Sequence, residues 1–361
     1  APSLVGSEMC IRDRLNTINL RLIKVVRFFV LIIFLLIPIT TLSQIGGTSS
    51  FRFLDMSMSA KELSLANAIT LKDSSLESAL SNPSTINSQH GGKIMLNYEP
   101  YFEGIHRGTL AYALSVNREK AILFDINYIN YGDFNGYDEF GNSIGKFTGN
   151  ETSVGISSSH YFLKPNLYLG AKLKFILSHL DIYSSSAIAT DIGVFYESLK
   201  NDICFSILFR NFGKQITAYQ DVYEPLPTNL SLGFSNQLKY LPLRYHLTLH
   251  HLNKWPLSFN NPVDESNSFS NNNFKNGFFK KVLSHSTFGV ELFPEGSFNL
   301  RLGYHSQRSS ELRILGIRNF SGMSFGVGFN VRRFNFQVSH SRYSVAGNRT
   351  FFGFTITPKN G

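Results

Sequence analysis

The sequence predicts an all-β fold, a transmembrane antiparallel up-and-down β-barrel of about 14 strands. Three observations lead to this prediction. Apolar residues alternate with small or polar residues in many short segments. Aromatic residues make up 14% of the chain and charged residues only 16%, against a usual charged share of about 25%. No segment after residue 43 resembles a membrane-spanning helix, and closed barrels are the other architecture that crosses a membrane.

A secretory signal peptide is predicted in residues 15–43. Basic residues precede the apolar core FFVLIIFLLIPI (Phe28–Ile39), and Thr41-Leu42-Ser43 provides small residues for signal peptidase. The apolar run is shorter than the roughly 20 residues of a spanning helix, and no cysteine directly follows it, which argues against a lipoprotein. We therefore expect the mature chain to start at Gln44 and to reach the outer membrane of a Gram-negative bacterium.

The first residues, APSLVGSEMCIRDR (1–14), resemble a translated sequencing adapter and are excluded from the fold prediction. Residues 1–43 carry five basic and two acidic side chains, so the net charge of +9 for the whole chain falls to +6 for residues 44–361. A charge this mild does not indicate nucleic-acid binding. Cys204 is the one cysteine after residue 43, so no internal disulfide is possible in the mature chain.

The alternation is clearest in GMSFGVGFNVR, Gly322–Arg332, where large apolar residues at odd positions are separated by Ser, Gly and Asn. Successive side chains of a strand point to opposite faces, so one face of this segment is apolar and the other small or polar. Even strand numbers are usual in bacterial barrels, which gives the estimate of 14. The other clear candidates are Thr109–Asn117, Leu167–Leu177, Asn229–Gln237, Arg244–Asn253, Ser297–Ser306 and Phe334–Arg342. The weaker ones are Ile94–Tyr101, Ala121–Asn130, Thr152–Phe162, Ala187–Glu197, Ile203–Asn211, Ser286–Leu292, Glu311–Arg318 and Thr350–Thr357.

A soluble β-sandwich also shows alternation and is the main alternative fold. Its second face would usually be charged, whereas here that face is often Gly, Ser, Thr or Asn. Many of the candidate strands also begin or end with Tyr or Phe, as the aromatic girdles of membrane barrels do. The pattern therefore favours the barrel, which we assign to residues 91–361.

Two segments lack the alternation. Residues 44–90 are polar and non-periodic, with a proline stop at Pro83, and cannot face lipid. We expect them to form an N-terminal plug against or inside the barrel lumen. Residues 253–281 are rich in Asn, Ser and Phe and predict one long loop on the extracellular side.

Several residue patterns resemble catalytic or metal sites. His246 and His250 have the spacing of a metal pair on a helix, but on a strand they lie roughly 13 Å apart, which favours lumen-facing polar residues. The pairs Ser159-His160, Ser284-His285 and Ser339-His340 suggest a hydrolase. Adjacent strand residues point to opposite faces, so no such pair makes a nucleophile and base, although a pair between strands stays open.

Charged residues fall on the strand faces opposite the apolar ones: Lys172, Lys174, Glu291 and Arg301, together with His305. They could line a conduction path. The favoured interpretation is that they pair with one another or with the plug.

The stretch INYGDFNGYDEFGNSIGKF, residues 129–147, crowds Asp133, Asp138 and Glu139 among glycines and aromatics. A calcium loop would need carboxylates or amides at alternate positions, a central Gly and a closing Glu, and the aromatic residues interrupt that order. Asn-Gly and Gly-Asn are turn chemistry. We interpret the stretch as a hairpin loop between neighbouring strands, with its aromatics at the membrane–water boundary, and one that could meet a partner.

A resemblance to a known family extends along nearly all of residues 46–356. The matching stretches, in order, are GGTSSFRFLDMSMSAKELSLAN, ALSNPS, LNYEPYFEGIHRGTLAYA, INYGDFNGYDEFGNSIGKFTG, LFRNFGKQITAY, EPLPTNLSLGFS, LTLHHLNKW, LRLGYHSQRSSELR, GMSFGVGFNVRRFNFQVSHSRYSVAG and FFGFTI. With these stretches the chain resembles the PorQ family, outer-membrane components of the type IX secretion system.

The resemblance implies a FadL-like barrel with an N-terminal plug. It implies a non-enzymatic role in a cargo attachment complex, where the barrel tethers a PorZ-like surface protein beside the sortase PorU and the barrel PorV. That complex cuts the C-terminal signal from cargo and joins the cargo to anionic lipopolysaccharide. The family offers no catalytic, cofactor or metal residues, and the sequence does not identify the partner-binding residues. The alternatives are a FadL-like channel for hydrophobic solutes and, from the Ser-His pairs alone, a barrel hydrolase.

Overall fold

The computed structural model describes residues 49–69, 73, 75–102, 104–117, 119–163, 166–198, 202–255, 281–312, 320–342 and 347–358. The expectations for residues 1–14, for the signal peptide in residues 15–43 and for the start of the mature chain at Gln44 lie outside these residues.

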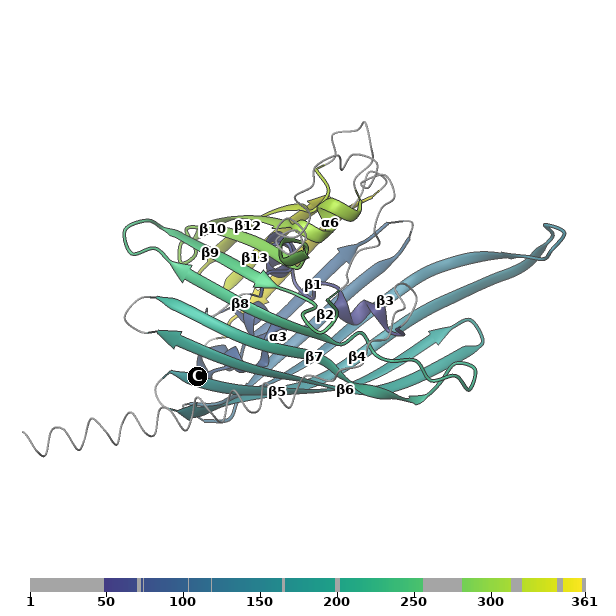
Figure 1. The fold of residues 1–361 in the computed structure, drawn as a ribbon, viewed down its shortest axis with the longest axis horizontal. Coiled ribbons are helices and arrows are strands. Elements are labelled where there is room, and N and C mark those ends of the chain that lie inside the picture. Colours follow the sequence, from purple (N-terminus) through teal and green to yellow (C-terminus); the bar gives the residue numbers. More distant parts are fainter. Residues whose placement is uncertain are drawn as a thin grey trace, which may run out of the picture. The chain divides into compact units, whose positions relative to one another are not determined.

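Fourteen antiparallel strands form one closed barrel, in which each strand pairs with its neighbours in sequence and β1 pairs with β14 (Figure 1). This confirms the predicted fold class and strand number. The strands are β1 (Ile94–Pro100), β2 (His106–Ser115), β3 (Ala121–Tyr137), β4 (Ser143–Leu163), β5 (Leu167–Leu180), β6 (Tyr183–Ser198), β7 (Ile203–Thr217), β8 (Asn229–Gln237), β9 (Leu243–Leu249), β10 (Ser286–Leu292), β11 (Phe298–His305), β12 (Met323–Val331), β13 (Phe334–Arg342) and β14 (Asn348–Ile356).

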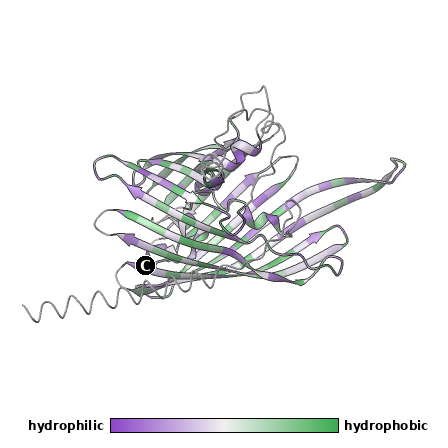
Figure 2. Cartoon of the chain, viewed as in Figure 1, coloured by the Kyte–Doolittle hydropathy of each residue, from purple (hydrophilic) through white to green (hydrophobic). Residues whose placement is uncertain are grey.

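The apolar face of the strands points outward. In β12, Phe325 is 53% exposed, whereas its neighbour Ser324 is buried. The same alternation runs through the other strands, so the outside of the wall carries a belt of Leu, Ile, Val, Phe and Tyr (Figure 2). The inward positions hold small, polar or charged side chains. The barrel is therefore apolar outside and polar inside, the reverse of a soluble domain.

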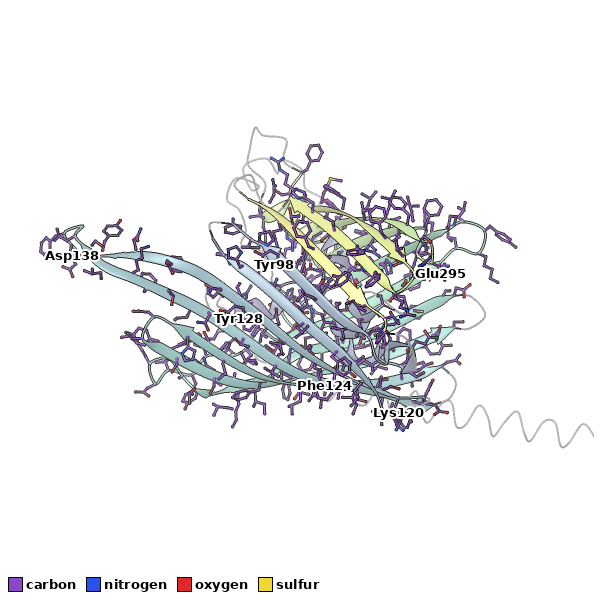
Figure 3. All side chains as sticks on the ribbon, turned by 180° about the vertical axis from the view of Figure 1, so that it is seen from behind. Tyr98, Lys120, Phe124, Tyr128, Asp138 and Glu295 are labelled. Atoms are coloured by element: carbon purple, nitrogen blue, oxygen red, sulfur yellow. The ribbon has the colours of Figure 1, made fainter. Side chains whose placement is uncertain are left out.

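The connections between strands differ at the two ends of the barrel. At the end where β1 begins and β14 stops, every connection has five residues or fewer, and we call it the short-turn end. At the opposite, long-loop end, the connections include residues 218–228, 250–285 and 306–322. Figure 3 shows Lys120 near the short-turn end and Asp138 at the tip of the longest hairpin, beyond the long-loop end. The predicted loop 253–281 connects β9 to β10 at the long-loop end, and its residues 256–280 lie outside the described chain.

The candidate strand Glu311–Arg318 falls mostly outside the described chain, because residues 313–319 are not among the described residues. Its first residue, Glu311, ends helix α6 (Ser306–Glu311). The side chain of His305 accepts a hydrogen bond from the backbone N–H of Arg308 and so caps the helix. Gln307 and Glu311, one helical turn apart, are also hydrogen bonded at 2.9 Å. The other fourteen of the fifteen candidates each overlap one of the strands β1–β14.

The described residues between 49 and 90, here named the inner segment, lie inside the ring of strands (Figure 1). Their short helices are η1 (Arg52–Asp55), α2 (Ala60–Ser64), α3 (Leu76–Ser81), η2 (Pro83–Thr85) and η3 (Ser88–His90). Among the described residues, no helix is long and apolar enough to cross a membrane. The helices begin at polar caps: Ser59 accepts from the N–H of Glu62, and Asn87 and His90 form a capping box.

Inward-facing glycines make room for the inner segment. A Cβ at Gly170 on β5 would lie 2.2 Å from the backbone N of Ser84, and one at Gly303 on β11 would lie 2.4 Å from the backbone C of Leu65. Real Cβ atoms do not come this close, so only glycine lets the backbone of the inner segment approach the wall here. The small second face of the strands therefore has a direct structural cause.

Candidate functional site

The charges on the inner wall are paired. Lys172 lies 2.8 Å from Asp125, and Lys174 lies 2.7 Å from Asp191. All four side chains are buried. Each pair joins neighbouring or nearby strands across the wall, so these lysines bind wall carboxylates and do not line an open path. This confirms the favoured interpretation of these two lysines.

Glu291 on β10 is the centre of the largest ion cluster. Its carboxylate lies 2.8 Å from Nε of Arg301, 3.5 Å from Nη1 of Arg244 and 3.5 Å from Nζ of Lys61 in helix α2. Lys61 also pairs with Asp73. The cluster therefore links the barrel wall to the inner segment, as the sequence predicted for Glu291 and Arg301.

Further polar contacts join the inner segment to the wall. The amide of Gln337 on β13 donates to the carboxylate of Glu77 at 2.7 Å. Arg210 on β7 lies 3.7 Å from Glu62. At the seam of the barrel, Glu99 on β1 accepts from Arg349 on β14 at 2.7 Å and from Arg107 on β2 at 3.2 Å. The inner segment is thus held to the wall from more than one side.

The histidines behave as lumen-facing polar residues. His246 is buried, with Nε2 3.8 Å from Glu291, and His250 is buried with its ring stacked on that of His305 at a centroid separation of 6.0 Å. This confirms their predicted orientation. The described residues contain no group of three or more His, Cys, Asp or Glu side chains with metal-site geometry.

The Ser-His dipeptides do not pair internally in the described structure. Ser159 donates to the carbonyl of Ile86, Ser284 donates to that of Lys281, and Nδ1 of His340 lies 3.0 Å from the hydroxyl of Thr350. A cross-strand contact does exist between Ser231 and His250 at 3.4 Å. The Ser231 hydroxyl also donates to Asn229 at 2.9 Å, so it is not poised to give its proton to the histidine.

The β3–β4 hairpin extends past the rest of the wall. β2 pairs with β3 only as far as Asn130, and β5 pairs with β4 only from Gly149. Beyond these points, residues 133–137 and 143–148 pair with each other and with no other described strand. We name residues 131–148 the ribbon. The interpretation of residues 129–147 as a connecting loop is corrected: the connection is residues 138–142, and the remainder is strand.

A bulge marks the base of the ribbon. The register of β3 against β4 shifts between Asn130 and Asp133, and Gly132 within it has a φ of 78°. The Asn130 side chain accepts from the N–H of Gly132 at 2.8 Å. Such bulges bend a strand and increase its twist, which explains how the ribbon leaves the curvature of the wall here.

The tip of the ribbon is organised by Asp138. Its carboxylate accepts hydrogen bonds from the side chain of Asn142 at 2.9 Å and from the backbone N–H groups of Asn142 and Phe140 at 2.8 and 2.9 Å. These bonds, first that of the Asn142 side chain, lower the pKa of Asp138 below its ordinary value. The carboxylate therefore serves the turn, which leaves the calcium-loop alternative without its central ligand.

We expect the tip to loosen in acid. Because the pKa of Asp138 is lower folded than unfolded, its stabilising effect is present above the ordinary value of 3.8 and is lost as pH falls through the lower folded value. In NMR of the detergent-solubilised protein, the amide signals of Phe140 and Asn142 should titrate with a midpoint below 3.8. Asp138→Asn should abolish this titration. A midpoint at or above 3.8 would contradict the assignment.

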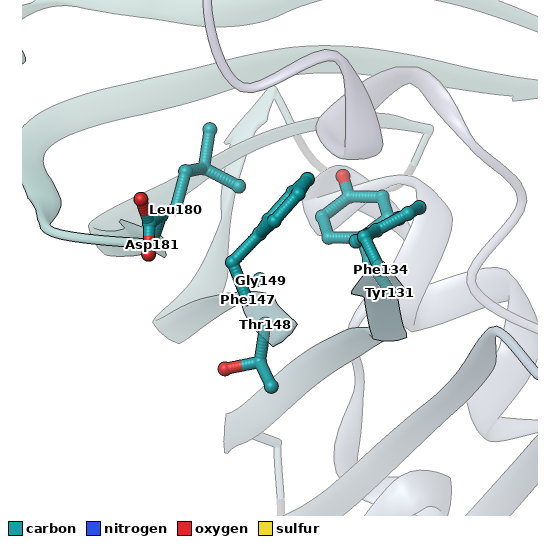
Figure 4. Close-up of a pocket in the computed structure, with 7 residues that line it drawn as sticks. All are labelled: Tyr131, Phe134, Phe147, Thr148, Gly149, Leu180 and Asp181. Atoms are coloured by element: carbon teal, nitrogen blue, oxygen red, sulfur yellow. The ribbon is translucent and has the colours of Figure 1, made fainter. Parts of the chain in front are cut away.

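The two faces of the ribbon differ in character. On the side that continues the inner face of the barrel, the rings of Phe134 and Phe147 stack at 5.2 Å. With Tyr131, Leu180 and the backbone of Gly149, they line an open pocket of about 320 Å³ (Figure 4). The opposite face carries Asp133 and Lys146, 4.0 Å apart. The aromatics of this stretch are therefore on the ribbon, past the last wall pairing, and their place at the membrane–water boundary stays a prediction.

The neighbouring hairpins add exposed apolar and acidic residues. Ile182 in the β5–β6 turn is 80% exposed and Phe140 at the ribbon tip is 88% exposed. The ribbon, the β5–β6 turn (181–182) and the β7–β8 loop (218–228) together carry six acidic side chains and one basic one, a net charge of −5. Residues 44–361 as a whole carry +6. This acidic and apolar region, the ribbon with these two connections, is the candidate functional site.

No family model and no curated protein matches the chain. Among solved structures, it is similar to a Pseudomonas aeruginosa FadL homologue, with 10% identity, 83% of this chain and 98% of the other covered, and a TM-score of 0.46. It is also similar to the outer membrane protein Omp33 of Acinetobacter baumannii, with 6% identity, 76% and 99% covered, and a TM-score of 0.37. These values carry no residue and no function from those proteins to this chain.

Proposed function

We propose that the chain is an outer-membrane β-barrel with a FadL-like architecture. The support comes from its own wall: a closed sheet without edges, an apolar outer belt and a polar interior. In a bilayer every backbone polar group needs an internal partner, and closure provides it. The long-loop end would then face the outside of the cell, because barrels of this type have short periplasmic turns and longer outer loops.

Within that membrane, the chain acts as a non-enzymatic tether for a surface protein. The observation that carries this proposal is the contrast between a filled interior and an extended outer ribbon. Ion pairs at Glu291 and Arg210 and a hydrogen bond from Gln337 bind the inner segment to the wall, which leaves little use for the barrel as a path. The ribbon instead presents apolar and acidic side chains beyond the wall.

The resemblance to the PorQ family suggests the complex in which the tether would act. In that setting the surface partner is PorZ-like, and the barrel acts with a PorU-like sortase and a PorV-like barrel in the attachment complex of a type IX secretion system. The residues of this chain supply anchorage in the membrane and a docking surface, and the partners supply the chemistry. Lipid and lipopolysaccharide surround the outer belt.

A channel for hydrophobic solutes is the competing function, and the packed interior argues against it. A solute path would need a continuous space past the inner segment. The glycines at 170 and 303 instead bring that segment into backbone contact with the wall on two sides.

Deletion of the gene tests the tether. We expect the surface partner to leave the cells and accumulate in the medium, because its anchor is gone, and a plasmid copy of the gene should return it to the cells. Uptake of a labelled fatty acid should be unchanged. Retention of the partner on deleted cells would contradict the tether, and a loss of fatty-acid uptake would favour the channel.

A further inference from the structure

The inner face of the ribbon is an apolar surface without a described cover. Phe134 is 41% exposed and Phe147 39% exposed, although they stack on each other and stand above the barrel mouth. Most other exposed apolar side chains of the strands belong to the outer belt, where lipid would cover them. These two lie past the last pairing of the wall and on the opposite face of the sheet from that belt. Aromatic rings beside an open pocket are typical of an interface anchor site.

The pocket has a defined shape. The aromatic rings of Tyr131, Phe134 and Phe147 form one side and Leu180 the other. Tyr131 is held in place by its hydroxyl, which donates to Glu151 on the inner wall. The N–H of Asp181 donates to the carbonyl of Thr148 at 2.9 Å, which fixes the β5–β6 turn against the base of the ribbon. The lining is therefore preorganised, as binding pockets for a single side chain are.

The negative charge of this region indicates which kind of molecule would bind in the pocket. The ribbon and its two neighbouring connections carry six acidic side chains, here called the acidic rim, against Lys146 alone, and Asp181 of this set lines the pocket. Phosphate groups of lipopolysaccharide would be repelled by this rim. A second copy of the chain would bring the same acidic surface against its own, which is also unfavourable. A protein segment with basic side chains matches the rim.

The ribbon also favours an extended partner. No other described strand pairs with residues 133–137 or 143–147, so their outer edges can accept main-chain hydrogen bonds from an added strand. An added segment would place alternate side chains on the inner face of the ribbon, where the pocket lies.

We propose that the inner face of the ribbon docks a basic, extended segment of the surface partner, with an aromatic or aliphatic side chain in the pocket of Tyr131, Phe134, Phe147 and Leu180. This inference rests on the proposed tether and names its docking surface. The apolar anchor provides affinity, and the acidic rim provides orientation and rate of association.

The test uses the full-length, affinity-tagged chain, recovered from outer membranes in mild detergent with its bound surface proteins. The double variant Phe134→Ser/Phe147→Ser should recover the partner at least about tenfold less well than the unmodified chain, as expected for the loss of central aromatic anchors. The variant Glu139→Lys/Asp221→Lys should weaken recovery most at low salt, because it reduces the net charge of the ribbon and its two neighbouring connections from −5 to −1. Tyr240→Ser is the matched control, since Tyr240 is a 97% exposed aromatic in the β8–β9 turn at the opposite end.

A photo-crosslinking amino acid in place of Phe147 identifies the occupant directly. We expect it to trap the same partner, through a peptide that is basic and has an aromatic or aliphatic residue at the crosslink. Every variant should keep the heat-sensitive electrophoretic migration of a closed barrel, because the ribbon lies outside the wall.

The outcomes separate the two proposals. Undiminished recovery by Phe134→Ser/Phe147→Ser, or crosslinks to lipopolysaccharide or to a second copy of this chain, would overturn the docking surface and leave the tether standing. Recovery of no surface protein by the unmodified chain, together with retention of the partner after gene deletion, would overturn the tether and the docking surface with it.

Discussion

Replacement of Glu291 by alanine is expected to destabilise the protein by about 3–5 kcal/mol, because it leaves buried cations without their carboxylate. Arg301, Arg244 and Lys61 all lie within 3.5 Å of this side chain, and Glu291 itself is fully buried. Lys61 belongs to the inner segment, so the loss should also loosen that segment. Guanidinium unfolding of the detergent-solubilised barrel measures the change in free energy of unfolding.

Glu295→Ala provides the control for this substitution. Glu295 stands in the turn after β10, has a side chain that is 77% exposed, and lies 3.8 Å from the same Arg244. Exposed ion pairs contribute little, so we expect a change within about 0.5 kcal/mol. Equal effects of the two substitutions would show that the Glu291 cluster does not hold the structure together.

Replacement of Gly170 by alanine is expected to displace the inner segment, because the added Cβ would lie 2.2 Å from the backbone of Ser84. Backbone cannot yield as the end of a flexible side chain does, so the cost should reach or exceed the about 1–3 kcal/mol of an overpacked core. Trypsin should then cut after Lys61, which is buried in the unmodified chain. Conductance across planar bilayers should rise at the same time.

Gly233→Ala is the matched substitution for this test. Gly233 is also an inward-facing strand glycine next to the inner segment, but its added Cβ would meet Ile69 at 3.5 Å, an ordinary contact. We expect no trypsin cleavage at Lys61 and no gain of conductance. If Gly170→Ala behaved like Gly233→Ala, the close approach of η2 to the wall would not be needed to keep the barrel filled.

The local alternation of apolar and polar residues predicted the strands of the wall well. One face of each strand meets lipid and the other meets protein, and this pattern does not depend on contacts distant in sequence. At the start of the candidate Glu311–Arg318, Glu311 belongs to a helix that is capped by His305 and carries a Gln307–Glu311 contact. The sequence also indicated that residues 44–90 would not face lipid. It could not show that Lys61 would meet Glu291, because contacts between residues so distant in sequence depend on the closed barrel.

The candidate site could be predicted only in part from the sequence. Turn residues such as Asn135 and Gly136 favoured a loop, whereas cross-strand stacking of Phe134 on Phe147 keeps this region in strands. A signal was present: apolar and polar residues still alternate from Asp133 to Gly136 and from Gly145 to Thr148. The pocket itself was not predictable, because Leu180 comes from the next hairpin and the bulge at Gly132 sets the angle of the ribbon.

The seam between β1 and β14 has a consequence for the order of assembly. Glu99 and Arg349 are 250 residues apart, and Glu77 and Gln337 are 260 residues apart, so these bonds form only after nearly the whole chain has been made. Contacts this remote in sequence make folding slow. The inner segment precedes every strand in the chain, yet its enclosure is complete only when the final strand joins the first. A chain that stops before β14 would therefore lack the β1–β14 seam and would not fully enclose its inner segment. The unpaired edge of β1 and the inner segment would then be exposed to the quality control of the cell envelope.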